Sequence, residues 1–358
     1  MEKTIAVLPG DGIGPEVIRQ ARKVLGSIEA VFGHKFNYVE GLVGACAIEA
    51  TGSPFPKETE NICRKADAIL FGAIGDPKYD NDPSARVRPE QGLLAMREKL
   101  GLYANIRPVQ SYKALLESSP LKADIIDGTD FVVFRELTGG IYFGKPRGRS
   151  ECGNVAYDTC VYTKEEIDRM AHLALAAARN RRGKVTLVDK ANVLATSRLW
   201  RERVRAVAAG YPDVELDYMF VDNAAMQIIL NPRKFDVILT ENMFGDILTD
   251  EASVISGSLG MLPSASVGAE RSLFEPIHGS YPEAAGHNIA NPFGAILSAA
   301  MMLGYTFDMH HESAAIIPAV NYAMQAGYVT RDINPLHSFG TEAVGDKVAT
   351  RIAALSLA

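Results

Sequence analysis

The sequence predicts an α/β protein whose sheet contains much parallel pairing. Short apolar segments rich in β-branched residues recur along the chain, and each is followed by glycines or charged residues and then by a helical pattern. Strands that alternate with helices are typical of parallel sheets covered by helices. Ligands of such proteins bind beyond the carboxyl ends of the strands, so the residues that end each strand are candidates for a functional site.

The first strand is expected in TIAVLPGDG (4–12), before a helix that starts around EVIRQ. The segment GDGIGPE has Pro15 where a G-x-G-x-x-G dinucleotide motif needs glycine. We therefore interpret it as a tight strand-to-helix turn with Pro15 in the first helical turn, and a backbone close to a ligand is the alternative. A second strand, ADAILFGAIG (66–75), also ends in glycines.

Four later strands, between residues 130 and 246, each end in charged residues. These ends carry Arg135, Lys190, Asp222 and the Glu241–Asp246 loop. One charged residue at a strand end means little, but four in succession predict a site at that edge of the sheet.

The segment 141–163 differs from its neighbours, because aromatic and β-branched residues flank a Gly/Pro/Arg turn. This pattern predicts a protruding hairpin. An exposed two-stranded arm is barely stable alone, so we expect it to pair with another subunit.

The composition excludes several classes of protein. The chain has 358 residues, 47% hydrophobic and 22% charged, with a net charge of -6, so it can form two ordinary globular domains. No basic stripe indicates nucleic acid, and no apolar run is long enough for a signal peptide or a membrane span. The four cysteines lack zinc-site spacing, which favours reduced thiols in a cytoplasmic protein.

Asp246 and Asp250 lie four residues apart in an expected helix, where like charges destabilise by a few tenths of a kcal/mol. One interpretation makes Asp246 a helix N-cap, with Asp250 tolerated near the positive helix end. The other adds Asp222, because three carboxylates without nearby His or Cys suit Mg²⁺ or Mn²⁺. A divalent ion would convert the repulsion into shared coordination.

The segment 88–108 places Glu90, Leu93, Leu94 and Arg97 on one helix face. The face is either an ordinary amphipathic stripe with leucines in the core, or an apolar pocket wall with Arg97 ready for an anion. Arg97, Arg107 and Arg135 together would form a guanidinium cluster for carboxylates.

Two single residues carry weak signals. Lys190 gains weight from its strand-end position, since burial near a metal would lower its pKa enough for proton transfer. Tyr142 has no such support from its position alone.

The long loop 274–294 contains HGS and NIAN segments that offer donors to a nucleotide, and Glu283 could accept from ribose hydroxyls. An ordered omega loop is the alternative.

Together these segments resemble the β-decarboxylating dehydrogenases, the family of isocitrate and 3-isopropylmalate dehydrogenases. The resemblance covers nearly the whole chain, and NMFGDILTDEASVISGSLGM (242–261) matches the family's 20-residue signature throughout. The segment Glu90–Leu94 resembles the isopropylmalate branch, whereas isocitrate enzymes have serine and asparagine on this helix. A third substrate carboxylate would be left unpaired against leucines, which is costly.

The resemblance implies an activity: NAD-dependent oxidative decarboxylation of (2R,3S)-3-isopropylmalate to 4-methyl-2-oxopentanoate and CO₂, in leucine biosynthesis. It also implies roles for individual residues. Substrate would be bound by Glu90, Leu93, Leu94, Arg97, Arg107, Arg135 and Asp222. Mg²⁺ or Mn²⁺ would be bound by Asp222, Asp246 and Asp250. Lys190 would act as base, and Tyr142 would deliver a proton to the enol carbon.

For the cofactor, the resemblance implies an NAD site in the 274–294 loop and the glycine turn. Its residues would be Ile13, Glu275, His278, Gly279, Ser280, Tyr281, Pro282, Glu283, Gly286, Asn288 and Asn291. The acidic Glu283 would repel a 2′-phosphate and so favour NAD over NADP. The chain has Tyr281, Glu283 and His287 where the family usually has Ala, Asp and Lys. The Gly75–Arg88 loop is expected to close over the cofactor.

The implied fold has two α/β domains that share a continuous mixed sheet and is not a Rossmann fold. The first domain would combine residues 1–101 and 257–358 on the nucleotide side. The second would span residues 102–256, with the substrate and metal residues and the dimer-interface arm. Lys190 and Asp222 would reach the site from the other subunit, so the resemblance implies a homodimer.

Other functions compete with this hypothesis. A D-malate, tartrate or homoisocitrate dehydrogenase would share the family and differ at the 90–94 wall. A non-catalytic regulatory homologue should lack some chemical residues, yet Lys190, Tyr142 and the three aspartates are present. A Mg²⁺-dependent phosphoryl-transfer enzyme would need a G-x-x-x-x-G-K-[ST] loop, which we do not find.

Overall fold

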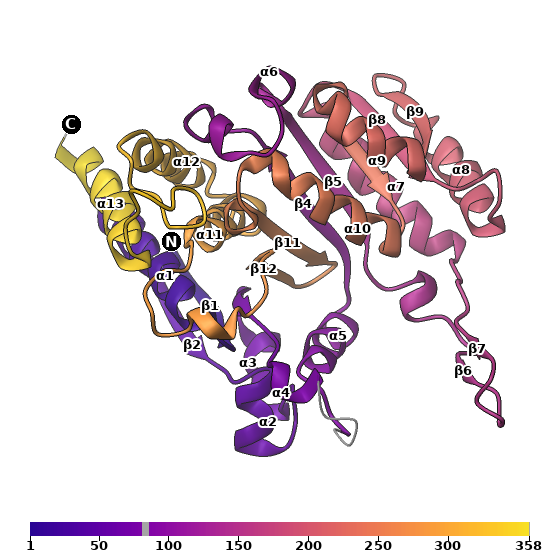
Figure 1. Ribbon diagram of the computed structural model, residues 1–358, viewed down its shortest axis with the longest axis horizontal. Helices are drawn as coiled ribbons and strands as arrows, with labels where there is room; N and C mark the ends of the chain where they lie inside the picture. Colours follow the sequence, from indigo (N-terminus) through magenta and orange to yellow (C-terminus); the bar gives the residue numbers. More distant parts are fainter. Residues whose placement is uncertain (81–85, 358) are drawn as a thin grey trace. The chain divides into compact units, whose positions relative to one another are not determined.

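A computed structural model of the chain describes residues 1–80 and 86–357. Ten strands form one mixed sheet in the order β2-β1-β3-β12-β11-β4-β5-β10-β8-β9 (Figure 1). The fold class predicted from the sequence is therefore confirmed as α/β. The strands of this sheet are β1 (Glu2–Gly10), β2 (Lys35–Glu40), β3 (Ala68–Ala73), β4 (Leu102–Gln110), β5 (Asp130–Glu136), β8 (Lys184–Asp189), β9 (Glu215–Phe220), β10 (Val237–Thr240), β11 (Pro263–Gly268) and β12 (Ser272–Pro276).

Helices alternate with most of these strands, as the sequence predicts. The α-helices are α1 (Gly14–Phe32), α2 (Ala45–Thr51), α3 (Lys57–Lys65), α4 (Pro77–Asp80), α5 (Glu90–Lys99), α6 (Ala123–Ile126), α7 (Lys164–Arg179), α8 (Ala195–Ala208), α9 (Val221–Leu230), α10 (Asn242–Ala252), α11 (Phe293–Tyr305), α12 (His310–Gln325) and α13 (Thr341–Ala353). Short 3₁₀ helices include η2 (Gly140–Tyr142), η4 (Ser253–Ser256) and η6 (Pro282–Ala284).

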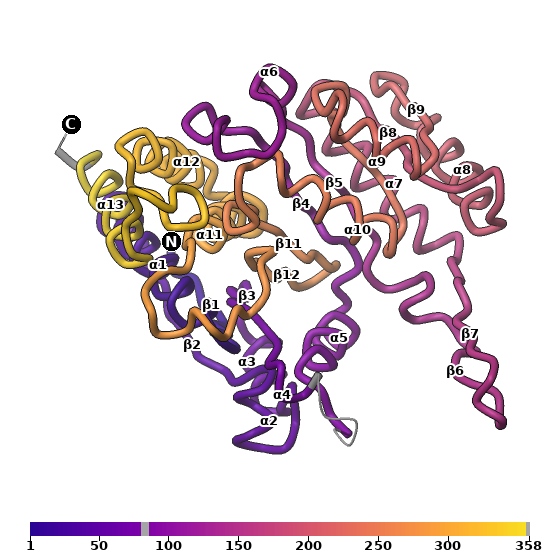
Figure 2. Tube along the Cα trace, in the orientation of Figure 1, coloured from indigo at the N-terminus to yellow at the C-terminus, as the bar shows by residue number. Residues whose placement is uncertain are grey.

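The chain divides into two compact units. Unit 1 comprises Met1–Leu102, Tyr112–Ser118 and Gly257–Ala358, and unit 2 comprises Tyr103–Ser111 and Ser119–Ser256. Both chain ends belong to unit 1, as the colour path in Figure 2 shows.

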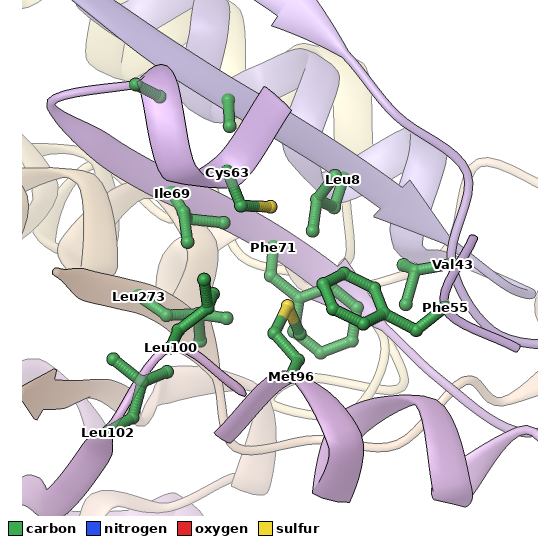
Figure 3. Close-up of a cluster of buried hydrophobic side chains, with 12 residues drawn as sticks. Leu8, Val43, Phe55, Cys63, Ile69, Phe71, Met96, Leu100, Leu102 and Leu273 are labelled. Carbon is green, nitrogen blue, oxygen red and sulfur yellow. The ribbon is translucent and has the colours of Figure 1, made fainter. Parts of the chain in front are cut away.

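Unit 1 contains parallel strands β2, β1, β3 and β12, with β11 antiparallel to β12. Helix α11 is apolar on all sides and is almost entirely buried, which is typical of a helix at the centre of a unit. A second cluster of apolar side chains is gathered around Phe55, Phe71 and Met96 (Figure 3). Met96 belongs to α5, so this cluster anchors the helix that carries the predicted substrate-binding leucines.

Unit 2 contains parallel strands β5, β10, β8 and β9, with β4 antiparallel to β5. Because β5, β10 and β8 run in one direction, their carboxyl ends lie at one edge of the sheet. Arg135, Lys190 and helix α10 follow or end these strands.

The predicted hairpin is present in unit 2 as a thin arm. Strands β6 (Gly148–Arg149) and β7 (Ala156–Tyr157) pair antiparallel, and the arm protrudes from the unit (Figure 1). Val155 and Tyr157 are 58% and 46% exposed there. Two paired residues per strand cannot hold such an arm rigid in water, so its exposed apolar side chains are suited to a protein partner.

Two further sequence expectations can be compared with the structure. Pro15 lies in the first turn of α1, as expected, and all four cysteines are free thiols. Within residues 1–80 and 86–357, no helix is long and apolar enough to cross a membrane.

Candidate active site

Helix α10 carries the aspartate pair at the edge of unit 2. Its N-cap is Glu241, whose side chain accepts from the backbone N–H of Phe244 at 2.8 Å. The interpretation of Asp246 as the N-cap is therefore wrong, because this helix begins four residues earlier. Asp246 and Asp250 lie one turn apart within the helix, and their side chains are 37% and 69% exposed.

Two buried arginines lie against the aspartate pair. Arg135, 3% exposed, donates from Nη1 to Oδ1 of Asp246. Arg107 reaches Oδ1 of Asp250 at 3.5 Å and Oδ1 of Asp246 at 3.9 Å. Gly245 permits the close approach, since a Cβ there would lie 2.7 Å from Cγ of Arg135. The two guanidinium groups offset the repulsion between the carboxylates.

The hydroxyl of Tyr142 joins this cluster from η2. It donates to Oδ2 of Asp246 at 3.0 Å, and the tyrosine is 37% exposed. Desolvation and the charge of Asp246 raise the pKa of Tyr142. The phenol is therefore protonated at neutral pH and can donate a proton.

Desolvation also acts on Asp250. Together with the neighbouring charge of Asp246 it raises the pKa of Asp250, while Arg107 opposes the rise. Carboxylates that crowd one another in this way gain most from a shared cation.

Lys190 and Asp222 form a separate pair in unit 2. Lys190 follows β8 and Asp222 lies in the first turn of α9, and Nζ of the lysine lies 2.5 Å from Oδ1 of the aspartate. This hydrogen bond lowers the pKa of Asp222. Behind the lysine, the buried carboxylate of Asp189 binds Arg201 through two hydrogen bonds of 2.6 and 3.0 Å, which fixes the strand end.

A single chain does not gather the three predicted metal ligands. In the described ranges, no three His, Cys, Asp or Glu side chains group closely enough to hold a metal ion. Asp246 and Asp250 nevertheless fit a hard divalent cation, because both are partly exposed carboxylates on one helix face. A third oxygen ligand has to be supplied from elsewhere.

Helix α5 of unit 1 carries the residues predicted to form a pocket wall. Leu93 packs against the apolar cluster around Met96, whereas Leu94 is 39% exposed and Glu90 is exposed. The interpretation that buries both leucines in the core therefore applies to Leu93 alone. Arg97 is largely buried, and its Nη2 lies 3.8 Å from Oε1 of Glu275.

Unit 1 also contains a cavity of about 580 Å³. Ligand pockets in proteins commonly have such volumes. Five of the predicted cofactor residues line it, namely Ile13, His278, Gly279, Tyr281 and Asn291.

The glycine turn forms one wall of this cavity. The N–H of Ile13 donates to the carbonyl of Ser280 at 2.8 Å, and a Cβ on Gly12 would lie only 1.9 Å from that oxygen. Asp11 holds the turn in place, because its buried carboxylate accepts from the N–H groups of Ala45 and Gly75 at 2.8 and 3.0 Å. The alternative interpretation of the turn, a backbone close to a ligand, agrees with this position.

His278 lines the cavity and carries a buried ring nitrogen without a partner among the described residues. Its Nδ1 lies 2.9 Å from the carbonyl of Gly279, while its buried Nε2 has no partner among the described residues. Desolvation lowers the pKa of His278, so the ring is neutral at neutral pH. With Nδ1 donating to a carbonyl, Nε2 is left as a hydrogen-bond acceptor.

The other predicted cofactor residues lie outside the lining of this cavity. Glu283 and His287 are exposed, and Pro282 is half-buried. Gly286 donates its N–H to Glu16, and Asn288 accepts from the N–H of Glu342 at 2.9 Å. Gly286 and Asn288 line a smaller cavity of about 350 Å³.

Part of the predicted Gly75–Arg88 lid, residues 81–85, lies outside the described residues.

Sequence reasoning missed other residues that line the cavity, among them Ser258, Gly260, Arg331 and Asp332. Oδ2 of Asp332 accepts from Oγ of Ser258 and from Nδ2 of Asn291, the latter at 3.0 Å. Asp332 thus fixes Asn291, one of the predicted cofactor residues. Gly260 lies inside the signature segment, which was the available signal, whereas nothing in the local pattern marks Asp332.

The fold and this pair of sites define a dehydrogenase of the β-decarboxylating type. The family model described as isocitrate/isopropylmalate dehydrogenase matches residues 4–348, and the chain belongs to this family. Among solved structures, isocitrate dehydrogenase from Methylococcus capsulatus is 32% identical, with a TM-score of 0.87 over 98% of this chain and 99% of that one. A β-decarboxylating dehydrogenase from Thermococcus kodakarensis is 37% identical, with a TM-score of 0.80 over 99% and 97%.

More similar relatives are curated as 3-isopropylmalate dehydrogenases. The one from Bacteroides fragilis is 55% identical over 96% of this chain and 97% of its own length. Those from Geobacillus kaustophilus and Bacillus subtilis are 57% and 52% identical, over 92% and 98% of this chain and 90% and 98% of their own lengths.

Proposed function

We propose that this protein catalyses the NAD-dependent oxidative decarboxylation of 3-isopropylmalate to 4-methyl-2-oxopentanoate and CO₂, as a step of leucine biosynthesis in the cytoplasm. Relatives of 52 to 57% identity that carry this name support the substrate. The structural observation that carries the reaction class is the joint contact of Asp246 with Arg135 and Tyr142. This contact supports Arg135 as an anion-binding residue and Tyr142 as a proton donor, because both side chains meet at one carboxylate.

The arginines bind the two carboxylates of the substrate. Arg107 and Arg135 are buried and lie beside Asp246, so their charge is only partly screened by water. Guanidinium groups of this kind bind carboxylates through paired hydrogen bonds. Arg97 is the third member, and its partner Glu275 holds it at the end of α5.

Asp246 and Asp250, with Asp222 of a second subunit, are the residues that would hold Mg²⁺ or Mn²⁺. When bound, the divalent ion supplies Lewis acidity that stabilises negative charge developing on the substrate oxygen. Lys190 would accept the hydroxyl proton, and NAD⁺, when bound, would supply the acceptor for the hydride. After CO₂ leaves, the protonated phenol of Tyr142 delivers a proton to the enol carbon.

NAD occupies the cavity of unit 1 in this proposal. Nε2 of His278 is a buried acceptor without a partner among the described residues, as expected for an atom that meets a nucleobase amino group. Glu283, exposed beside the cavity-lining Tyr281, opposes a 2′-phosphate by charge. Both observations support NAD as the cofactor.

A homodimer completes each site. The separation of the Lys190–Asp222 pair from the Asp246 cluster supports a site built from two copies of the chain. Helices α9 and α10 expose large apolar side chains, with Met226, Leu230 and Ile247 at 56%, 62% and 61%. Exposed apolar side chains on neighbouring helices are typical of a subunit interface.

Helix α5 selects among the diacids. Leu94 is 39% exposed, with Glu90 one turn away on the same face, and this accessibility supports Leu94 as the residue that receives the isopropyl group. Malate and tartrate lack that group, and a third carboxylate would meet apolar surface.

Purified protein with NAD⁺, Mg²⁺ and a panel of 2-hydroxy diacids tests the proposal. We expect NADH to form fastest, at low substrate concentration, with 3-isopropylmalate. Faster turnover of malate, tartrate or homoisocitrate would assign a different substrate, and absence of NADH with every diacid would reject the reaction.

A further inference from the structure

Asn242, the first residue of α10, lies against the guanidinium group of Arg135. The side chain is buried, with 1% exposed, and its Oδ1 accepts from Nε and Nη2 of Arg135 at 3.1 and 2.8 Å. These two N–H groups form one edge of the planar guanidinium group. A single amide oxygen therefore fixes the orientation of the plane, and Nη1 is left to meet Asp246.

The other end of the same amide reaches the turn that carries Tyr142. Nδ2 of Asn242 donates to the carbonyl of Gly139 at 3.2 Å. Gly139 caps η2, whose last residue is Tyr142. One side chain thus connects the arginine that clamps the diacid with the tyrosine that delivers the proton.

A buried network holds Asn242 itself. Its backbone N–H donates to the hydroxyl of Tyr162 at 2.9 Å, and that hydroxyl donates to Oε2 of Glu241 at 3.0 Å. The other oxygen of Glu241 caps α10. The ring of Tyr162 packs edge-on against Trp200 with 5.4 Å between centroids. Buried networks with this degree of satisfaction are rigid.

We propose that Asn242 is a positioning residue for the reaction, setting the direction of Arg135 and the place of Tyr142 together. The inference rests on the proposed function. Position 242 requires one side-chain group that offers both an acceptor for Arg135 and a donor for the carbonyl of Gly139. Aspartate would keep the acceptor, but it would face the carbonyl of Gly139 with a second negative oxygen and would neutralise Arg135. Alanine would supply neither atom.

The test compares Asn242→Asp and Asn242→Ala with the wild-type dimer. We expect both variants to raise KM for 3-isopropylmalate about tenfold, as a misdirected guanidinium group loses a charged hydrogen bond, and to lower kcat about tenfold. KM for NAD⁺ should stay unchanged. Ser256→Ala is the matched control, because it removes one buried hydrogen bond of unit 2, from Oγ to the carbonyl of Gln110 at 2.9 Å.

Thermal unfolding of the same proteins separates positioning from stability. We expect Ser256→Ala to melt at a lower temperature and to keep wild-type kcat and KM. The same result for the two Asn242 variants would overturn the proposal. Wild-type turnover is measured alongside. A wild-type protein that forms no NADH would contradict the proposed function. In that case, calorimetry would measure the affinity of the wild type and of both Asn242 variants for the diacid. Unchanged affinity in both variants would reject the proposal that Asn242 orients Arg135.

Discussion

At the residue scale, Asp246 is the side chain on which the site of unit 2 converges, since Arg135 and Tyr142 both bond to it. Asp246→Asn keeps the shape and removes the charge. We expect kcat/KM to fall by about a hundredfold or more, and the dependence of the rate on Mg²⁺ to weaken. Titration of the rate with Mg²⁺ measures this, with the exposed Asp127→Asn as control. An unchanged Mg²⁺ response would count against Asp246 as a ligand.

His278 makes stability depend on pH. Burial lowers its pKa below the ordinary 6.5, so the unfolded chain binds a proton that the folded chain does not. The free energy of unfolding should therefore decrease as the pH falls below 6.5, down to the folded pKa. His278→Gln should show a smaller decrease between about pH 7.5 and about pH 5.5 in denaturant titrations. Equal slopes would show that another group is responsible.

Glu283 tests the cofactor preference. The side chain is exposed and does not line the cavity, so we expect it to act on a 2′-phosphate by charge at a distance rather than by close contact. Glu283→Lys should shift the ratio of kcat/KM for NAD⁺ over NADP⁺ toward NADP⁺ by about tenfold. His287→Lys adds one charge nearby and serves as a matched comparison. An unchanged NAD⁺/NADP⁺ ratio of kcat/KM in the Glu283 variant would show that Glu283 does not contribute to cofactor preference.

Residue roles were predictable from sequence only where chain position or family pattern marks them. Arg135 and Lys190 stand at strand ends, so their location could be expected. Asn242 opens the signature segment, which marks its place but not its partners, and Asp332 bears no mark at all. Their hydrogen bonds to Arg135 and Asn291 join residues 107 and 41 positions apart in the chain. Long-range partners of this kind come from packing and not from periodicity.

At the scale of elements, α5 divides its two leucines between the core and the surface. Leu94→Ala should lower the preference for 3-isopropylmalate over malate by about tenfold with little loss of stability, because a few methylenes in a pocket contribute about 1 to 3 kcal/mol. Leu93→Ala should lower the preference and also destabilise the fold, since Leu93 packs on the core. Kinetics with both diacids and thermal melts distinguish the two. An unchanged preference in both variants would remove the substrate assignment.

Helices α9 and α10 make the subunit interface testable. Ile247 is 61% exposed on α10, so lysine at this position would cost the isolated chain little. In a dimer packed on this face, Ile247→Lys buries an unpaired charge. We expect it to convert the protein to monomers in light scattering and to abolish turnover. A stable dimer with normal activity would place the interface elsewhere. Lys164→Ile, at the exposed first residue of α7, controls for a change of surface charge.

Strand–helix alternation was the most dependable element-scale signal. It gave β1, β3, β5, β8, β9 and β10 from short apolar runs that end in polar residues. It did not give the β11–β12 pair, which contains serine, proline and glycine and is apolar only in part. Such strands are held by their buried neighbours in the sheet, a tertiary effect that local composition does not carry.

At the scale of the whole molecule, a site shared between two copies predicts complementation. Lys190→Met and Asp246→Asn should each be inactive as a homodimer. In a mixed dimer, one of the two sites combines the intact Lys190 of one chain with the intact Asp246 of the other, and the second site contains both substitutions. Unfolding and refolding the two variants together should therefore restore about a quarter of wild-type activity, if subunits pair at random. No recovery, with mixed dimers demonstrated by mass, would mean that each chain builds its own site.

Whole-molecule architecture was accessible from the sequence only through the family resemblance. Composition and alternation predict α/β, but the order of ten strands depends on pairings between segments far apart in the chain, such as β3 with β12. No local pattern specifies those partners. The division of labour between the two units likewise stays a prediction until a bound diacid and a bound nucleotide are located.

Asp246 and Asp250 occupy a single rigid helix, so the rise of that helix, about 6 Å over four residues, sets how far apart their backbones stand. No loop can widen or narrow that gap. The ligand from the second subunit would therefore have to move to accommodate an ion of another radius. Discrimination between Mg²⁺ and larger ions such as Ca²⁺ would then depend on how rigidly the two subunits are packed together.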